Sequence, residues 1–507
     1  MKIQKLGHLC LLLFCCLMAA CSDSNDEPTK KGEEPKPLSK EIKITGIEEA
    51  YSVKLGNKLM IAPKIENPSN LKLTYEWGIN YSKVGDAASL NYECTTPGKY
   101  SGYVKVQTEE GTAQIKEFLL YVYSDYDQGL LLYTETDGQA RLGYKSLNEL
   151  EIPAVADVFA ENNPGLQLGK EPLALAWTGE GKTNLVTFDD NEGTEVVLAS
   201  GNPQKVYLLD ATTMKVKTEV AYNGEGTFAP NVAYAPYGSQ NFLWNKDHQV
   251  VYFVGGGRDY LMTAEHQFIV GKRRHQIPSY AKIADMNCTL ITNPMDMVRV
   301  YFDTATHHLI YIGGIRGMVE SKIACNVSPM ALLACSGHYA DANADHRYEP
   351  GQLLFVGHNG GNVSIYHFAP AANKAEEVLI SETSASGHIA STDALGVNPI
   401  KPFLYYGNKK GEIFIYNYEG RNFSDKAYAS LGEEYDIRKI VFNPYNPSQM
   451  YVAAQNTKAA ANESATIFVL DVSSNATAKV LYTGSKLGGT IRNLIYKGNG
   501  KEMQPRK

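Results

Sequence analysis

Short apolar stretches alternate with polar residues along most of this chain. The first such region contains IKITGIEEAYSVKLGNKLMIAPKI, LKLTYEW and KYSGYVKVQTEEGTAQIKEFLLYVYS. In the last of these, Val104 and Val106 alternate with polar or amphipathic residues, which is the two-residue period of a strand with one buried face. Strands of this kind, separated by turns, predict a small β-sandwich over residues 42–124 with Trp77 in its core.

A longer pattern repeats in the remainder of the chain. Each copy has an apolar strand, an Asn or Asp that begins a turn, and a second apolar strand; the copies are FLWNKDHQVVYFVGG (242–256), VYFDTATHHLIYIGG (300–314), LGVNPIKPFLYYGN (395–408) and IVFNPYNPSQMYVAAQN (440–456). Asn and Asp side chains can accept a hydrogen bond from the backbone two residues ahead. The turn residues are Asn245, Asp303, Asn398 and Asn443. The tyrosines that recur on the second strand, which we expect in the core, are Tyr252, Tyr311, Tyr405 and Tyr451.

These units recur at the spacing of a β-propeller blade. The second strand of the pattern begins near residues 130, 195, 250, 309, 353, 403 and 450, at intervals of 44 to 65 residues. A four-stranded unit that repeats at this length is typical of propellers. The chain is therefore predicted to be all-β, with a seven-bladed propeller over residues 125–507 behind the β-sandwich.

The two ends of this region predict how the ring closes. GLLLYTETDG (129–138) is a second strand with no first strand before it, and IRNLIYKG (491–498) is a first strand with nothing after it. The latter nearly repeats IRKIVFNP (437–444), 54 residues earlier. Because an unpaired edge strand invites aggregation, we expect the C-terminal strand to pair with the first one and to close the propeller.

The N-terminus has the form of a secretory signal. Two lysines precede roughly a dozen apolar residues, fewer than the about 20 that cross a bilayer. The sequence MAAC at residues 18–21 resembles a bacterial lipobox, which implies removal of residues 1–20 and acylation of Cys21. The alternative is an ordinary signal peptide followed by a chance cysteine. The lipidated cysteine and a charged, proline-bearing, disordered tether then make up residues 21–41.

The β-sandwich resembles a known domain type near its end. PGKY (97–100), followed by YVKVQTEEGTAQ, resembles the end of an immunoglobulin-like domain of the polycystic-kidney-disease (PKD) type. The aspartate-rich WDFGD motif of such domains is absent, because Trp77 is followed by GINYS. The resemblance therefore carries over no calcium or ligand site.

Charge argues against nucleic acid as a partner. The whole chain has a formal net charge of −7, and loss of Lys2 and Lys5 with the signal leaves 46 basic and 55 acidic residues, a charge of −9. The chain has no polybasic tract. Three of the eight cysteines leave with the signal and Cys21 is lipidated, so four remain, without a CxxC spacing: Cys94, Cys288, Cys325 and Cys335. We expect them to be buried apolar residues; a Cys325–Cys335 bridge is the alternative.

No sequence motif of catalysis is present. GxSxG, HExxH, a Walker loop and a GxGxxG between strand and helix are all missing, so the sequence favours a non-enzymatic protein without a cofactor. Asp341, Asn343 and Asp345 have the oxygen-ligand spacing of a calcium loop. They lack its glycine turn and its acid at the twelfth position, where Gln352 stands. A solvated insertion between strands is the other interpretation, and it fits better.

Basic residues recur in turns of the repeat and form the candidate binding site. If the turns after the second strands share one face of a propeller, the rim of that face is basic; its residues are Arg141, Arg258, Arg316, His358, Lys409 and Lys410. With Tyr260 beside Arg258, the rim suits an anionic or peptide-like ligand or a partner's acidic edge. The alternative is that these turns are merely solvated. Tyr234 and Tyr237, in a loop with Pro and Gly, are candidate stacking platforms or packing residues of the next blade.

The order of lipobox, tether, PKD-like domain and propeller in about 500 residues resembles the PKD-like family of lipoproteins from Bacteroidota. That resemblance implies residence at the outer membrane and association with SusC/SusD-type importers of glycans or peptides. Acids shortly after the lipidated cysteine resemble a surface-export signal, and Asp23, Asp26 and Glu27 supply them here. They favour a protein that faces the cell exterior, with a periplasmic orientation as the alternative.

Three functions remain open from the sequence. The first is a non-enzymatic, membrane-anchored accessory protein that binds a glycan or peptide, or docks on an importer. The second is a propeller enzyme, a lyase or hydrolase, that acts on a polysaccharide or peptide. The third is an assembly scaffold without a small ligand.

Overall fold

The protein is all-β, as predicted. The computed structural model describes residues 42–67, 70–179, 195–222, 230–234, 240–245, 250–254, 267–270, 282–293, 296–313, 317–335, 338–340, 347–370, 377–444 and 446–498. Helical structure in these ranges is confined to α2 (Val158–Asn162) and the 3-10 turn η3 (Ala461–Glu463). None of the helices described is long and apolar enough to cross a membrane.

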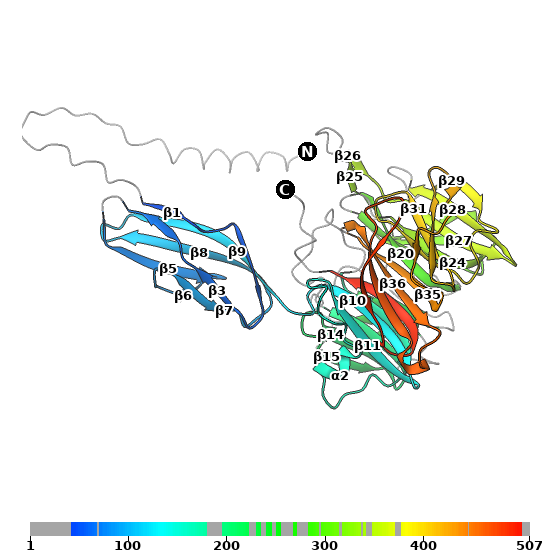
Figure 1. Cartoon of the computed structure of the whole chain (residues 1–507), viewed down its shortest axis with the longest axis horizontal. Coiled ribbons are helices and arrows are strands. Elements are labelled where there is room, and N and C mark those ends of the chain that lie inside the picture. Colours follow the sequence, from blue (N-terminus) through cyan, green and yellow to red (C-terminus); the bar gives the residue numbers. More distant parts are fainter. Residues whose placement is uncertain are drawn as a thin grey trace, which may run out of the picture. The chain divides into compact units, whose positions relative to one another are not determined.

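Nine strands make up the N-terminal region, coloured blue to cyan in Figure 1. They are β1 (Lys43–Thr45), β2 (Ala50–Lys54), β3 (Lys58–Ile61), β4 (Lys64–Glu66), β5 (Leu73–Ile79), β6 (Ser82–Gly85), β7 (Leu90–Glu93), β8 (Gly98–Thr108) and β9 (Ala113–Tyr123). Five of them form a sheet in the order β2-β9-β8-β5-β6, and the other four form the pairs β1-β4 and β3-β7.

The alternation and the core tryptophan predicted for this region are both confirmed. Along β8, Val104 and Val106 are buried, while Tyr103, Lys105 and Gln107 beside them are partly exposed. Trp77 on β5 is fully buried. Its indole N–H donates to the carbonyl of Ala87 at 2.9 Å, and its ring meets that of Phe118 edge-on, with centroids 6.4 Å apart. The core is thus filled by a large side chain whose single polar atom is satisfied.

The chain divides into two compact units. The smaller takes Met60–Tyr92, Ser101–Leu119 and the residues up to Glu49. The larger takes Ala50–Leu59, Glu93–Tyr100 and everything from Leu120 onwards. Each unit has its own buried residues.

The larger unit is built from antiparallel sheets, numbered here in the order of their second strands. Sheet 1 contains β39 (Thr490–Lys497), β10 (Gly129–Thr136) and β11 (Gln139–Ser146); sheet 2 contains β12 (Lys170–Trp177), β13 (Glu195–Asn202), β14 (Gln204–Asp210) and β15 (Val216–Ala221). The pairing of Gln139 with Lys170 joins these two sheets.

The remaining sheets follow one another along the chain, from green to red in Figure 1. Sheet 3 contains β16 (Pro230–Tyr234), β17 (Gln240–Asn245), β18 (Val250–Val254) and β19 (Gln267–Val270), and sheet 4 contains β20 (Ile283–Asn293), β21 (Asp296–Asp303), β22 (His308–Gly313) and β23 (Gly317–Ala324). Sheet 5 contains β24 (Ser328–Ala334), β27 (Leu353–Asn359), β28 (Asn362–Pro370) and β29 (Glu377–Ser384), and β25 (His338–Ala340) pairs with β26 (Arg347–Glu349) between its first two strands. Sheet 6 contains β30 (Ala394–Val397), β31 (Phe403–Gly407), β32 (Glu412–Asn417), β33 (Asn422–Phe423) and β34 (Ala429–Ser430), and sheet 7 contains β35 (Tyr435–Asn443), β36 (Asn446–Asn456), β37 (Ala465–Asp471) and β38 (Lys479–Gly484).

The first strands of neighbouring sheets contact one another in chain order. The contacts run from β12 to β16, β20, β24, β30, β35 and β39. Strand β39 in turn contacts β12. The succession of first strands therefore returns to its starting point.

The predicted pairing of the C-terminal strand is confirmed. Strand β39 pairs antiparallel with β10, from Gly129 opposite Lys497 to Glu135 opposite Thr490. On β39, Leu494 and Tyr496 are buried and join a core cluster with residues of sheet 7. The ring of Tyr496 is stacked on that of Tyr451, with centroids 5.8 Å apart.

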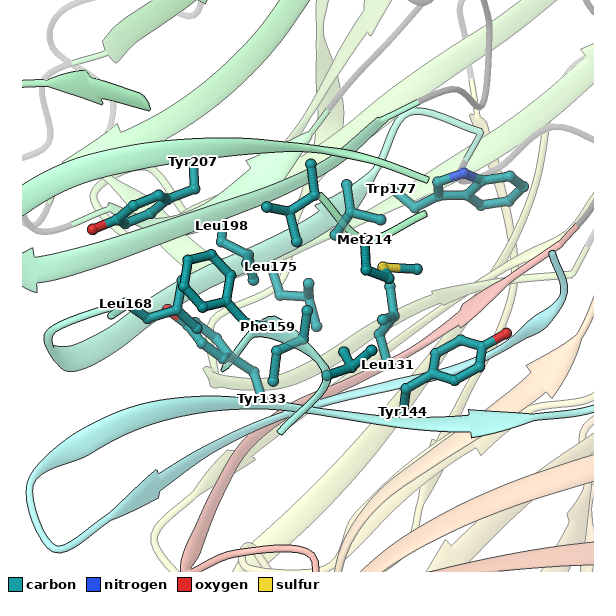
Figure 2. Packing of buried hydrophobic residues seen from close by; sticks show 14 of the residues in the cluster. Leu131, Tyr133, Tyr144, Phe159, Leu168, Leu175, Trp177, Leu198, Tyr207 and Met214 are labelled. Atoms are coloured by element: carbon teal, nitrogen blue, oxygen red, sulfur yellow. The ribbon is translucent and has the colours of Figure 1, made fainter. Parts of the chain in front are cut away.

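A second cluster lies between sheets 1 and 2. Figure 2 shows Phe159 of α2 among side chains from both sheets. Its ring meets that of Tyr207 edge-on at 5.6 Å, and the hydroxyl of Tyr133 donates to the carbonyl of Ala199 at 3.0 Å. Burial raises the pKa of the Tyr133 phenol. The short helix thus closes the gap between two sheets with an apolar side chain.

The structure confirms two features predicted for the repeat, its Asx turns and its buried tyrosines. The Asn398 side-chain oxygen accepts the N–H of Ile400 at 3.0 Å, and that of Asp303 accepts the N–H of Ala305 at 2.9 Å, as the Asx-turn interpretation predicts. The predicted core tyrosines are buried at all three positions whose side chains are described, namely Tyr311, Tyr405 and Tyr451. The side chains of Tyr252 and Asn245 lie outside the described residues.

The predicted position of each repeated strand pair within its sheet is correct for two of the four copies. The stretches at 395–408 and 440–456 are the first and second strands of sheets 6 and 7. The stretches at 242–256 and 300–314 are instead the second and third strands of sheets 3 and 4. Any two antiparallel strands joined by an Asx turn share the same pattern, so the pattern does not reveal how far each pair lies from the start of its sheet.

Two buried lysines stabilise the sheet that contains the C-terminal strand. Lys497 donates to the carbonyls of Tyr126 and Asp127 at 2.7 and 2.6 Å. Lys145 donates to the carbonyls of Glu149 and Ile152 at 3.2 and 2.6 Å, and its ammonium lies 4.3 Å from the ring centroid of Tyr482. Burial lowers the pKa of each lysine to about 8.

These lysines predict a rise in stability with pH. Nearby carboxylates raise the pKa of both groups, Glu151 for Lys145 and Asp127 and Asp210 for Lys497, but burial dominates. Because an unfolded lysine titrates near 10.5, the unfolded chain binds more protons than the folded protein between about pH 8 and pH 10.5. The free energy of unfolding should therefore rise with pH in that window, by at most about 3 kcal/mol per lysine.

Urea unfolding at pH 7.5 and pH 9.5 measures this effect. A Lys145→Met and Lys497→Met double variant should be less stable at both pH values and should gain less stability at the higher one. Equal gains in the variant and the original protein would show that these lysines do not titrate as expected.

Candidate functional site

Several predicted site residues lie outside the described residues. These are Cys21, Arg258, Tyr260, Arg316, Tyr237, Asp341, Asn343 and Asp345. The backbone of Tyr234 belongs to β16, but its side chain is not among those described. The lipidation site, the calcium candidate and the tyrosine platforms therefore remain predictions.

The other rim residues lie at turns between second and third strands, as predicted. Arg141 is the third residue of β11, after the β10–β11 turn, and lies opposite Thr134. His358 is the last but one residue of β27, and its ring Nδ1 lies 3.1 Å from the carbonyl oxygen of Gly360. Lys409 and Lys410 are exposed in the β31–β32 turn. In an antiparallel sheet such turns all leave from the end at which the second strand finishes.

Arg258 and Arg316 do not belong to this set of turns. Their residues connect β18 to β19 and β22 to β23, the third and fourth strands of sheets 3 and 4. Connections after the second and after the third strand leave opposite ends of an antiparallel sheet. The expectation that these two arginines follow second strands is therefore wrong, because it depended on the misplaced repeats of sheets 3 and 4.

Two arginines that the rim did not include occupy bulges on neighbouring first strands. Between β35 and β36 the register passes from Ile437 to Lys439, which leaves no residue opposite Arg438. Between β39 and β10 it passes from Ile491 to Asn493, which leaves no residue opposite Arg492. A bulge of this kind turns a side chain out of the regular alternation and is common next to functional sites.

The bulges do not themselves require arginine. Strands β12 and β24 have register shifts at the corresponding third or fourth residue, where Leu173 and Met330 stand. The fold therefore tolerates apolar residues at this position of a first strand. Arginine is specific to β35 and β39, which contact each other.

Each bulged arginine is paired with a carboxylate. Nη2 of Arg438 lies 2.7 Å from Oδ2 of Asp436. Nε of Arg492 lies 3.1 Å from Oε2 of Glu135, and its Nη2 contacts the same oxygen. The arginine side chains are 50% and 48% exposed, whereas those of Asp436 and Glu135 are 11% and 27% exposed. The carboxylates are thus held in the protein while the guanidinium groups reach solvent.

The start of β30 adds a further carboxylate and links this cluster to the predicted rim. Burial raises the pKa of Asp393, which directly precedes β30; the N–H of Ala390 and the charge of Lys409 oppose that rise, and Asp436 adds to it. Asp393 therefore lies within electrostatic reach of both the rim lysine and the partner of Arg438. Carboxylates accompany the cations here, so the described part of this end is of mixed charge and not a simple basic rim.

Gln455 and Gly489 hold β36, β10 and the start of β39 together. The Gln455 side chain donates to the Gly489 carbonyl at 2.8 Å and accepts the N–H of Ile491 at 3.3 Å. The Gly489 N–H donates to the Thr136 hydroxyl at 2.8 Å. A side chain at Gly489 would collide with the carbonyl of Glu135. A residue with a side chain would therefore not fit at position 489 unless the neighbouring backbone shifted.

The sequence contained a signal for this site that our interpretation did not use for function. The segments IRKIVFNP and IRNLIYKG place the same arginine after the same isoleucine. We used their similarity to assign strands. An arginine in a repeated strand position is itself informative, because the comparable bulges on β12 and β24 hold Leu173 and Met330.

The described cysteines and acids form no further recognisable site. Cys94, Cys288, Cys325 and Cys335 are all free, so the alternative of a Cys325–Cys335 bridge is wrong. Three of them are buried and Cys288 is partly so, close to the expectation of small apolar residues. Burial raises the pKa of the Cys288 thiol to about 12. Among the described residues, no group of three or more His, Cys, Asp or Glu side chains could hold a metal ion.

Comparisons with known proteins do not assign this chain to a family. No protein-family model and no curated protein sequence matches the chain. Solved structures of β-propeller proteins resemble it. A quinoprotein alcohol dehydrogenase-like protein from Bacteroides thetaiotaomicron is 13% identical, with 89% of this chain and 97% of that one covered and a TM-score of 0.44. The β-propeller domain of Cps50 (Swd1) from Myceliophteria thermophila is 13% identical, with coverage of 65% and 90% and a TM-score of 0.40.

Proposed function

We propose that the protein is a lipid-anchored, non-enzymatic binding protein of the bacterial outer membrane, an accessory component of a SusC/SusD-type system that imports glycans or peptides. Its larger unit is a seven-bladed propeller that the C-terminal strand closes. Two observations support this architecture: the circular succession of first-strand contacts and the pairing of β39 with β10. The N-terminal sheets, with Trp77 in their core, form the PKD-like module and serve as a spacer.

The anchor is argued from the sequence alone. Acylation of Cys21 by several chains attaches a protein stably, because each buried methylene contributes about 0.8 kcal/mol. The acids at positions 23, 26 and 27 support an orientation toward the cell exterior. Incorporation of labelled palmitate that is lost in a Cys21→Ala variant would support the anchor, and an unlabelled protein in the soluble fraction would exclude it.

One observation supports binding above the other functions. Arg438 and Arg492 are half exposed at bulges on neighbouring first strands, each with a carboxylate beside it. Leu173 and Met330 at comparable bulges show that the fold itself does not need these arginines. Side chains that offer donors and acceptors to solvent from rigid strands are suited to holding a ligand.

Thermal unfolding of the purified protein with a ligand panel tests this function. The panel contains neutral oligosaccharides, oligogalacturonates and short peptides. A ligand at 100 times its Kd stabilises the folded protein by about 2.7 kcal/mol, so at least one class should raise the Tm by several degrees. Chromatography of the same samples should recover the ligand unchanged. If no class raises the Tm, the scaffold function replaces binding.

The enzyme alternative has one specific observation in its favour. Asp393 and Asp436 are carboxylates at the starts of neighbouring first strands, and burial raises the pKa of Asp393. Paired carboxylates in unequal environments are used in acid–base chemistry on glycans. Product formation from any panel member, lost in Asp393→Asn, would establish this alternative over simple binding.

A further inference from the structure

The charge balance around the bulged arginines indicates which kind of ligand they bind, provided that the proposed binding function holds. A guanidinium has five N–H donors. Arg492 directs Nε and Nη2 to Glu135, and Arg438 directs Nη2 to Asp436. At about half exposure, both groups present donors to solvent beyond those that the carboxylates accept.

The site has little uncompensated positive charge. Asp436 and Glu135 each neutralise one arginine, and Asp393 lies within electrostatic reach of both Asp436 and Lys409. A phosphate, sulfate or uronate that approached the arginines would also meet these carboxylates. These carboxylates would repel an anionic ligand bound to the arginines beside them, so the arrangement disfavours such a ligand. Arginine clusters that bind anions leave their charge free for the ligand.

A neutral ligand with many hydroxyl groups matches the arrangement. Each hydroxyl is both a donor and an acceptor, and adjacent hydroxyls of one sugar ring can therefore accept from a guanidinium and donate to the carboxylate beside it. Hydrogen bonds to ionised groups are about twice as strong as those between neutral groups. A peptide carries its polar groups along an extended backbone and is typically held by a free strand edge or an apolar groove. This site instead presents two arginine–carboxylate pairs, at Arg438 and at Arg492.

We propose that Arg438 with Asp436, and Arg492 with Glu135, bind an uncharged oligosaccharide, each pair engaging neighbouring hydroxyl groups. The ligand spans the starts of β35 and β39, which contact each other. Because no net charge is neutralised on binding, the affinity should change little between 50 mM and 500 mM NaCl. An acidic glycan held by charge alone would bind markedly more weakly at the higher salt concentration.

Calorimetric titration with neutral oligosaccharides of glucose, mannose, galactose or fructose, and with oligogalacturonate, tests the site. Arg438→Gln and Arg492→Gln should each weaken binding of the neutral ligand by about tenfold or more, since each removes a charged donor. Arg438→Lys should also weaken it, because lysine lacks the planar fork. Lys205→Gln, which breaks an exposed ion pair with Glu219 on sheet 2, is the matched control and should bind normally.

A second measurement needs no variant and so does not depend on variant folding. Phenylglyoxal modifies exposed arginines, and peptide mass analysis locates the adducts. The neutral oligosaccharide should protect Arg438 and Arg492 in the intact protein. Arg421, an exposed residue between β32 and β33 whose Nη2 lies 3.4 Å from the Ile380 carbonyl oxygen, should remain as reactive as before.

The outcomes separate this inference from the proposed function. Neutral-glycan binding that is unaffected in all three arginine variants, without protection of Arg438 and Arg492, overturns the site but leaves the binding function intact. Binding of oligogalacturonate or of a peptide alone overturns the ligand class. If nothing in the panel binds, the proposed function and the inference fail together.

Discussion

Removal of residues 488–507 is expected to abolish cooperative unfolding of the larger unit. The deletion takes away β39, whose side chains of Leu494, Ile495 and Tyr496 are buried. At about 1.5–3 kcal/mol per buried apolar side chain, the loss is roughly 5–9 kcal/mol. That is comparable with the whole stability of a typical domain, 5–15 kcal/mol. The deletion also leaves β10 with a free edge.

Differential scanning calorimetry and light scattering measure this effect. The truncated protein should lose its main transition or aggregate on warming. A shorter truncation that removes only residues 500–507 leaves all of β39 and is the control. A truncation of 488–507 that melts like the full chain would refute the closure of the ring by the C-terminal strand.

Replacement of Trp77 by alanine is expected to destabilise the smaller unit by about 3–5 kcal/mol, the usual cost of removing a buried aromatic side chain. The variant loses the contact with Phe118 and leaves the Ala87 carbonyl without its indole donor. A unit of this size has a small core, so the loss should unfold much of it at 37 °C.

Calorimetry of the same variant also tests whether the two units unfold separately. The transition of the smaller unit should move to lower temperature or vanish, while that of the larger unit stays in place. Trp77→Phe, which keeps a ring but loses the N–H, should lie between the original protein and Trp77→Ala. An equal shift of both transitions would contradict two separately folding units.

Local patterns predicted the elements of this fold well. The two-residue alternation on β8 and the Asx turns at Asp303 and Asn398 depend on neighbours within a few residues, and such interactions can be read directly from the chain. The unmatched first strand at the C-terminus predicted its own partner, because β10 was the one strand without a first neighbour. Counting strands was enough for that inference.

The position of a strand pair within its sheet was harder to predict. The pairs β17–β18 and β21–β22 have the same pattern as β30–β31 and β35–β36, yet the former are displaced by one strand. The alternation of apolar and polar residues indicates which face of a strand is buried, but not which strands lie beside it in the sheet. That error placed Arg258 and Arg316 on the wrong set of turns.

The candidate site also depends on strand pairing that the sequence pattern does not reveal. Arg438 and Arg492 belong to strands that the sequence predicted, but a bulge is a difference in register between two strands, which no single strand encodes. Their partners, Asp436 and Glu135, come from the same strand in one case and from a strand more than 350 residues away in the other. Only the completed sheets bring these charges together.

The sequence by itself determined that this protein is all-β and which strand completes the first sheet. These features follow from short-range periodicity and from the count of strands. The tertiary structure decided which turns share an end of the larger unit and which charges neutralise one another there, because pairing between distant strands sets both. The turns alone predicted a basic rim at that end, whereas the structure has arginine–carboxylate pairs at two bulges there.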